Sequence, residues 1–189
     1  NYVFAGLLFF LIFALLIPPA VTYKAGEFSI LNDKYWSGLF ILPIILLAYF
    51  FSGLLTTFNG APFFKSKTGY MLLVSTEVVL GNIVLNFVLI PPLGMAGASF
   101  ATLISYILMY VHIYFISQKV YRIEFEWNKI SIISLTGVML YLMNILMNHY
   151  FKINYVLSIA LNLILISAFL FLNIGLKSVS KEGLKSLFR

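Results

Sequence analysis

One stretch decides the fold: residues 70–116 read YMLLVSTEVVLGNIVLNFVLI, then PPLG at 91–94, then MAGASFATLISYILMYVHIYFI. Each flanking run is apolar and close to the ~20 residues that an α-helix needs to cross a bilayer. Neither run shows the period-2 alternation of a membrane β-strand, and backbone amides in hydrocarbon have to be paired within the chain. Both runs are therefore predicted to be helices, and the turn at 91–94 predicts that they reverse direction and lie side by side.

The same pattern fills the rest of the chain. Of its 189 residues, 62% are hydrophobic and 10% are charged, whereas a water-soluble domain carries about 25% charged residues. We therefore expect an all-α polytopic membrane protein, with a six-transmembrane-helix bundle at 1–176 as its single lobe. The expected spans are 2–23, 36–58, 70–90, 95–116, 130–148 and 155–176, and a basic cytoplasmic tail follows at 177–189.

Prolines mark the expected kinks and ends of these helices, because proline lacks an amide donor. Pro18 and Pro19 are expected to kink or end the first span, and Pro43 to sit within the second as a tolerated kink. Asn59, Gly60 and Pro62 are expected to end the second span.

Lysine and arginine predict how the helices are oriented, because cytoplasmic connections carry an excess of both. Successive connections alternate between the two sides of the membrane, and the basic residues divide nine to three between those sides. We therefore expect an integral protein of the cytoplasmic membrane with both ends of the chain in the cytoplasm. The richer side holds Lys65, Lys67, Lys119, Arg122, Lys129, Lys177, Lys181, Lys185 and Arg189, and the other side holds Lys24, Lys34 and Lys152.

The net charge of +6 does not indicate a nucleic-acid partner. The basic residues lie in connections, where anionic lipid head groups are nearer, so membrane lipids are the expected partner. The chain has no cysteine, so we expect neither a disulfide framework nor a thiolate metal site. It begins at Asn1 with no visible signal peptide, and we expect it to be a fragment of a longer protein.

No motif indicates an enzyme. The spans hold no paired carboxylates, no His-Glu-x-x-His zinc helix, no nucleophile with a visible base and no glycine-rich phosphate loop. We therefore expect no catalytic residue, no metal and no cofactor.

Glu77 is an acid inside an expected span, where an ionisable residue typically marks an ion or substrate pathway. Two interpretations are open: it couples transport to an ion, or it is a neutral residue that ties two helices together by hydrogen bonding. Asn82 and Asn86 share one helix face, about 140 to 180° away from Glu77 at 3.6 residues per turn. All three are candidate pathway residues, although the asparagines are expected above all to join helices.

The next helix carries two more patterns. A stripe of small residues predicts close approach of another helix, as packing or as a surface that shifts against a partner. The stripe consists of Gly97, Ala101 and Ser105. Tyr106 and Tyr110 lie four residues apart, and they either line a substrate pathway or fill a core or interface position. His112 falls near the expected cytoplasmic end of this span and is predicted to be an interface residue.

The passage 81–106, GNIVLNFVLIPPLGMAGASFATLISY, resembles the polysaccharide export flippases. These belong to the multidrug/oligosaccharidyl-lipid/polysaccharide exporter superfamily. The similarity rests on two asparagines four residues apart, an Ile-Pro pair, a Gly-Ala pair and the closing Ala-Thr-x-Ile-Ser-Tyr. The similarity extends over about half of the chain and is to the carboxy-terminal half of the family's fold. Pro92 is an exception, because the family usually has a basic or polar residue at this position.

This resemblance implies that the chain is the second of two six-helix lobes that face each other across a cavity. Such lobes move a polyprenyl-diphosphate-linked oligosaccharide across the cytoplasmic membrane by alternating access. Glu77 is then the expected ion-coupling residue, and Lys65 and Lys67 are expected at the cytoplasmic mouth, where they can meet a diphosphate. The implied partners are membrane lipids, the lipid-linked oligosaccharide, the amino-terminal lobe of the same protein and glycan polymerase machinery.

Two other functions stay open on the sequence. One is a drug or metabolite antiporter of the same superfamily, which favours hydrophobic cations. The other is a membrane scaffold that uses its small-residue stripes to assemble with partners.

Overall fold

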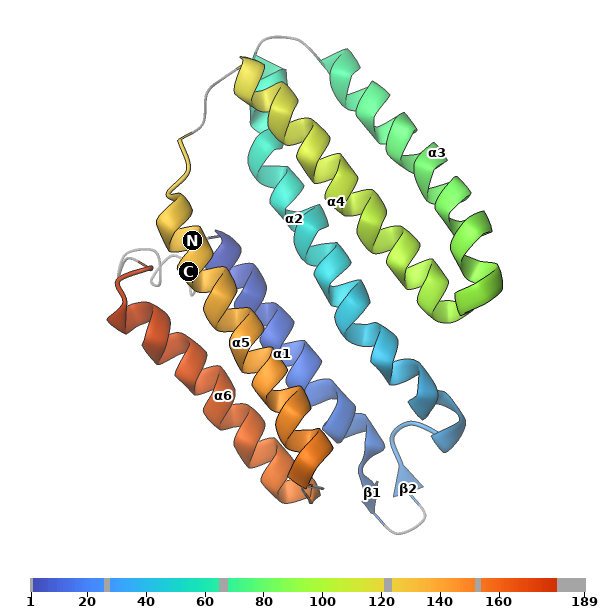
Figure 1. Ribbon diagram of the computed structural model, residues 1–189, viewed down its shortest axis with the longest axis vertical. Coiled ribbons are helices and arrows are strands. Elements are labelled where there is room, and N and C mark those ends of the chain that lie inside the picture. The colour runs from blue at the N-terminus through green and yellow to red at the C-terminus, as the bar shows by residue number, and fades with distance from the viewer. Residues whose placement is uncertain (1, 26–27, 65–67, 121–123, 152–153, 180–189) are drawn as a thin grey trace. The chain divides into compact units, whose positions relative to one another are not determined.

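The computed structural model describes residues 2–25, 28–64, 68–120, 124–151 and 154–179. Within these ranges the chain forms six α-helices, one 3₁₀ helix and two very short paired strands (Figure 1). The helices are α1 (Tyr2–Thr22), α2 (Leu42–Phe64), α3 (Thr68–Leu93), α4 (Met95–Val120), α5 (Trp127–Phe151) and α6 (Tyr155–Gly175), and the other elements are β1 (Lys24–Ala25), β2 (Phe28–Ser29) and η1 (Asp33–Ile41).

Six helical segments in the described part of the chain are long and apolar enough to cross a membrane. The expected all-α fold with six spanning helices is confirmed, and the protein is an integral membrane protein. These segments begin at Tyr2, Asp33, Leu72, Met95, Trp127 and Tyr155.

The helix bounds differ from the expected spans chiefly at prolines. Helix α1 continues through Pro18 and Pro19 to Thr22. Pro43 does not kink the interior of a helix, because α2 begins at Leu42 and Pro43 lies in its first turn. The amides of a first turn have no partner within the helix, so proline is tolerated there. The expected break at Asn59 is wrong, since α2 runs on to Phe64.

The turn between α3 and α4 is shorter than the sequence predicts. Helix α3 includes Pro91 and Pro92 and ends at Leu93, so Gly94 alone separates it from α4. Gly94 has φ of +56°, a left-handed conformation that glycine adopts without steric cost. Its amide donates to the carbonyl of Ile90 at 2.7 Å, and this reversal makes α3 and α4 antiparallel neighbours.

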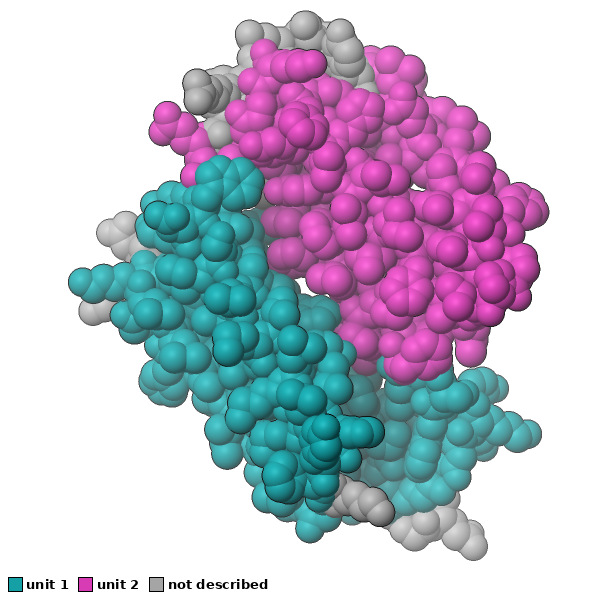
Figure 2. All heavy atoms as spheres, viewed as in Figure 1, with its two compact units in different colours: residues 1–39, 126–189 teal, residues 40–125 magenta. Residues whose placement is uncertain are grey.

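The contacts divide the chain into two compact units, residues 1–39 with 126–189 and residues 40–125 (Figure 2). In the first unit α1, α5 and α6 each pack against the other two. Its core is apolar, and Phe4 stacks on Phe169 with ring centroids 5.4 Å apart. Its fully or nearly buried side chains include Phe4, Leu11, Leu15, Ile133, Leu165 and Phe169.

Helix α6 has a well-defined cap at each end. Asn154 accepts a hydrogen bond from the amide of Leu157 at 2.9 Å, the usual N-cap arrangement. At the other end Lys177 has φ of +52°, and its backbone amide donates to the carbonyl of Ile174. The backbone amide of Ser178 donates to the carbonyl of Asn173. This pair of bonds is a Schellman motif, and it turns Ser178 and Val179 into buried positions at the start of the expected basic tail. Residues 180–189 of that tail lie outside the described residues.

In the second unit α4 lies between α2 and α3, and α2 has few contacts with α3 (Figure 1). A buried apolar cluster joins α2 to the open end of the α3–α4 hairpin. It consists of Leu55, Phe58, Val74 and Ile113. Helix α3 packs mainly against α4, and many of its described side chains are exposed.

Candidate functional site

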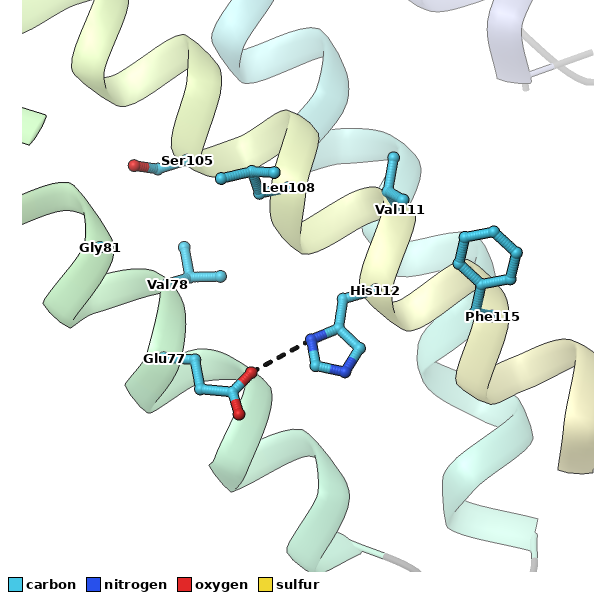
Figure 3. Close-up of a pocket in the computed structure, with 8 residues that line it drawn as sticks. All are labelled: Glu77, Val78, Gly81, Ser105, Leu108, Val111, His112 and Phe115. Atoms are coloured by element: carbon cyan, nitrogen blue, oxygen red, sulfur yellow. Dashed lines mark ion pairs between the residues drawn. The ribbon is translucent and has the colours of Figure 1, made fainter.

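Glu77 on α3 and His112 on α4 form an ion-pair contact between the two helices. Nδ1 of His112 lies 3.2 Å from Oε2 of Glu77, so the two side chains bridge the helices (Figure 3). Neither side chain is enclosed: His112 is 47% exposed and Glu77 is 59% exposed. The acid that the sequence singled out therefore has a specific partner on the neighbouring helix.

The pair lies inside the two membrane-length segments, toward the end opposite the Gly94 turn. At 1.5 Å per residue, Glu77 is about 24 Å along α3 from Leu93 and His112 is about 26 Å along α4 from Met95. With the Gly94 turn at one boundary of a hydrocarbon core about 30 Å thick, the pair is inside the opposite boundary. Because α4 continues to Val120, His112 lies about two turns from the end of this helix instead of about one.

The pair borders a groove between α3 and α4 with a volume of about 380 Å³. Most of its lining is apolar, and the close-up shows the two ionisable side chains pointing toward each other across it. The lining residues are Glu77, Val78, Gly81, Ser105, Leu108, Val111, His112 and Phe115.

The contact is an ion pair when His112 is protonated, with the positive charge on the imidazole and the negative charge on the carboxylate of Glu77.

The two asparagines lie on a different side of the α3–α4 contact, as the helical phase predicts. Nδ2 of Asn82 donates to Oγ of Ser105 at 3.1 Å, and Nδ2 of Asn86 donates to Oδ1 of Asn82 at 2.9 Å. Asn82, Ser105 and Tyr106 border a second groove of about 310 Å³, which does not include Glu77. Asn82 therefore joins the two helices, whereas the bonds of Asn86 in the described structure go to Asn82 on its own helix. The structure does not bring either asparagine into the groove beside Glu77.

Gly97 lies directly against the backbone of α3. A Cβ built on it would collide with the carbonyl group of Leu89 and approach the amide nitrogen of Ile90 to 2.8 Å. Ala101 and Ser105 follow on the same stripe, and both are buried. Close approach of α4 to the backbone of α3 is thus found at Gly97, near the turn.

The structure separates the two tyrosines from Glu77. Tyr106 and Tyr110 pack against the apolar cluster between α2 and α4, and Tyr110 contacts Phe58 edge-on with ring centroids 5.4 Å apart. Tyr110 is not among the residues that line these two grooves, and it occupies a packing position, one of the two roles that the sequence left open. Lys65 and Lys67 lie outside the described residues.

Sequence reasoning missed a buried polar network in the first unit. Asn144 on α5 donates to Oδ1 of Asn162 on α6 at 2.5 Å, and Asn162 donates to the carbonyl of Leu15 on α1 at 2.6 Å. Asn148 donates to Asn144 at 3.1 Å, as Asn86 does to Asn82 in the other unit. The signal was present in the sequence, because the spacing Asn-Ile-x-x-Asn occurs at 82–86 and again at 144–148.

No group of three or more histidine, cysteine, aspartate or glutamate side chains that could hold a metal ion occurs among the described residues. Comparison of the chain with family models, curated proteins and solved structures gives no match.

Proposed function

We propose that this chain is the carboxy-terminal lobe of a flippase that moves a polyprenyl-diphosphate-linked oligosaccharide across the cytoplasmic membrane by alternating access. The proposal combines the resemblance of residues 81–106 with one structural observation, the Glu77–His112 pair inside two membrane-length helices. Ionisable side chains at this depth are costly, and they typically mark a substrate or ion pathway.

The physical problem that such a protein solves is the polar head of the substrate. A hydrated, charged sugar diphosphate cannot cross about 30 Å of hydrocarbon unaided. Two lobes that enclose a polar passage and open it to one side at a time remove this barrier. The membrane lipids, an amino-terminal lobe and glycan polymerase machinery are the partners of this proposal.

A diphosphate also needs cationic partners. The residues that line the two grooves of α3 and α4 include no lysine or arginine. In this proposal the cations come from residues upstream of Asn1, or from Lys65 and Lys67 at the cytoplasmic mouth.

Reconstitution of the full-length protein in vesicles tests the proposal. Lipid-linked oligosaccharide is incorporated in both leaflets, and the fraction accessible to an external glycan-modifying reagent is followed with time. Protein-dependent equilibration between leaflets is expected, and equilibration at the rate of protein-free vesicles contradicts the proposal.

One observation favours a second candidate, an antiporter of hydrophobic cations. A hydrophobic cation is bound best by a carboxylate within an apolar groove, and the groove that Glu77 lines has this composition. Efflux of a cationic dye from the same vesicles separates the two functions: the antiporter transports the dye and leaves the glycan-lipid distribution unchanged.

A further inference from the structure

A groove at one end of the first unit has no role in the proposed function. It has a volume of about 500 Å³ and lies where α1 and α5 end and α6 begins (Figure 1). Helix α1 is about 30 Å long at 1.5 Å per residue, so its carboxyl end lies at a boundary of the hydrocarbon core. The groove therefore opens at the level of the lipid head groups. Its polar and aromatic lining residues are Thr22, Tyr23, Lys24, Asn148, Tyr155 and Ser158.

We propose that this groove binds one phospholipid through a phosphoethanolamine head group, a zwitterion that joins a phosphate to a primary ammonium. In the orientation predicted from the basic residues, this lipid belongs to the outer leaflet. The proposal does not depend on the flippase function. It follows from the hydrogen-bonding groups of the groove, from their charges and from their place at the membrane boundary.

Two side chains of the groove offer oxygen atoms that accept hydrogen bonds. Oγ1 of Thr22 donates its proton to the carbonyl of Pro18 at 2.8 Å, so its lone pairs remain for a ligand. Nδ2 of Asn148 donates to the carbonyl and to Oδ1 of Asn144, at 3.0 and 3.1 Å. The remaining capacity of Asn148 is that of its own Oδ1, an acceptor. Both side chains therefore call for a ligand with N–H or O–H donors.

The surroundings favour a cation beside these acceptors. The carboxyl ends of α1 and α5 carry partial negative charge, because their last carbonyls have no amide partner within the helix. The rings of Tyr23 and Tyr155 lie with their centroids 4.4 Å apart, and aromatic faces attract ammonium groups. A primary ammonium brings three N–H donors to this place, whereas the trimethylammonium of a choline head group brings none.

The phosphate of the head group has donors in the same groove. Nζ of Lys24 lies 2.6 Å from Oδ2 of Asp33 and 4.9 Å from the centroid of the Trp36 ring, so this side chain is held in place. An ammonium has three N–H donors, and two remain after the bond to Asp33. Ser158 adds a hydroxyl on the first turn of α6, where the positive end of the helix favours an anion.

The balance of charge selects between head groups. Among the described residues that line the groove, Lys24 alone is charged, and Asp33 balances it. An anionic glycerol head group supplies the phosphate and leaves the charge of the groove uncompensated. A phosphoethanolamine head group supplies both charges and is itself neutral. We therefore expect the groove to select a lipid by its N–H donors and not by its net charge.

Binding of single lipids to the full-length protein in detergent tests the site. Native mass spectrometry compares phosphatidylethanolamine, its monomethyl and dimethyl forms, phosphatidylcholine and phosphatidylglycerol, all with the same acyl chains. Affinity is expected to fall with each N–H that is replaced, by about tenfold between phosphatidylethanolamine and phosphatidylcholine. Phosphatidylglycerol is expected to bind no more tightly than phosphatidylcholine.

Substitutions assign this preference to the groove. Thr22→Val removes an acceptor at nearly constant volume, and Lys24→Gln removes the cation. Each is expected to lower the affinity for phosphatidylethanolamine by about tenfold, whereas Thr22→Ser keeps the hydroxyl and is expected to retain binding. Lys34→Gln is the matched control, because it removes the same charge from the same connection and Lys34 does not line the groove. It is expected to leave binding unchanged.

Four results overturn the proposal. They are equal affinities for phosphatidylethanolamine and phosphatidylcholine, tighter binding of phosphatidylglycerol, an equal loss in Lys24→Gln and Lys34→Gln, and a preference that survives both Thr22→Val and Lys24→Gln. The methylated series uses the unchanged protein, so it remains decisive if a variant does not fold. None of these measurements involves transport, and the flippase function stands or falls separately.

Discussion

Nδ2 of Asn162 on α6 lies 2.6 Å from the carbonyl oxygen of Leu15 on α1. In an uninterrupted helix this carbonyl would accept from the amide four residues later, but that residue is Pro19, which has none. The buried asparagine thus supplies the donor that the proline removes. This bond compensates for Pro19 within α1, which remains a helix through Thr22.

Asn162→Leu should therefore destabilise the first unit by about 1–3 kcal/mol, because it leaves a buried carbonyl and the amide of Asn144 without a partner. In a Pro19→Ala background the cost should fall, since the restored amide of residue 19 can pair with Leu15. Unfolding titrations in micelles on the four variants of this cycle measure the coupling. Equal costs in the two backgrounds would show that the proline and the asparagine act independently.

Gly97→Ala should weaken the α3–α4 hairpin by about 1–3 kcal/mol, the usual cost of forcing extra atoms into a packed contact. The added methyl group would meet the backbone of Leu89, which cannot rotate away. Gly81→Ala is the matched control on α3, because nothing lies within 4 Å of its added Cβ. It should be neutral or stabilising by up to about 1 kcal/mol, the helix preference of alanine over glycine. The same unfolding titration compares the two.

Asn82 and Ser105 should show a coupling energy of about 0.6 kcal/mol, the average for hydrogen bonds between membrane helices. The double-mutant cycle uses Asn82→Leu and Ser105→Ala. Ser167→Ala serves as a control, since Ser167 bonds only the carbonyl of Leu163 on its own helix in the described structure. A coupling energy near zero would mean that the bond does not hold the helices together.

Lys177→Gly should stabilise α6 by about 1 kcal/mol, because glycine adopts the left-handed conformation of this C′ position without the steric cost that a side chain carries. The neighbouring Leu176 has φ of −76°, so Leu176→Gly should instead destabilise the helix through the entropy of the unfolded chain. Thermal unfolding in micelles compares the two substitutions, and opposite signs are expected.

The membrane orientation is tested with single cysteines in place of Lys65, Lys119 and Lys152. The distribution of basic residues predicts that the first two are protected from an impermeant thiol reagent outside intact cells and that the third is labelled. After the cells are opened, all three should react. Labelling of Lys65→Cys and Lys119→Cys from opposite sides would contradict the predicted topology.

The number and type of the helices were predictable because each apolar run is long enough to cross a bilayer and has no alternative pairing for its amides. The reversal at Gly94 was also predictable, since proline and glycine follow each other there. The ends of α2 could not be predicted from the sequence. Asn59, Gly60 and Pro62 disfavour a helix in isolation, yet α2 runs through them to Phe64.

The candidate site was predictable only in part. Glu77 is conspicuous as an acid in an apolar run, and its helical phase separates it from Asn82. Its partner His112 depends on the register between α3 and α4, which the one-residue turn at Gly94 and the close approach at Gly97 determine. The same holds for Asn162 and Leu15, whose contact joins residues 147 positions apart.

The order of elements has a consequence for biogenesis. Residues 40–125 form one unit without interruption, whereas the other unit needs both the beginning of the chain and residues from 126 onward. During synthesis α1 enters the membrane before α5 and α6, and until α6 follows the carbonyl of Leu15 lacks its partner Asn162. We therefore expect nascent chains truncated before α6 to be substrates for membrane quality control. We also expect the unit of α2, α3 and α4 to be complete before the unit of α1, α5 and α6.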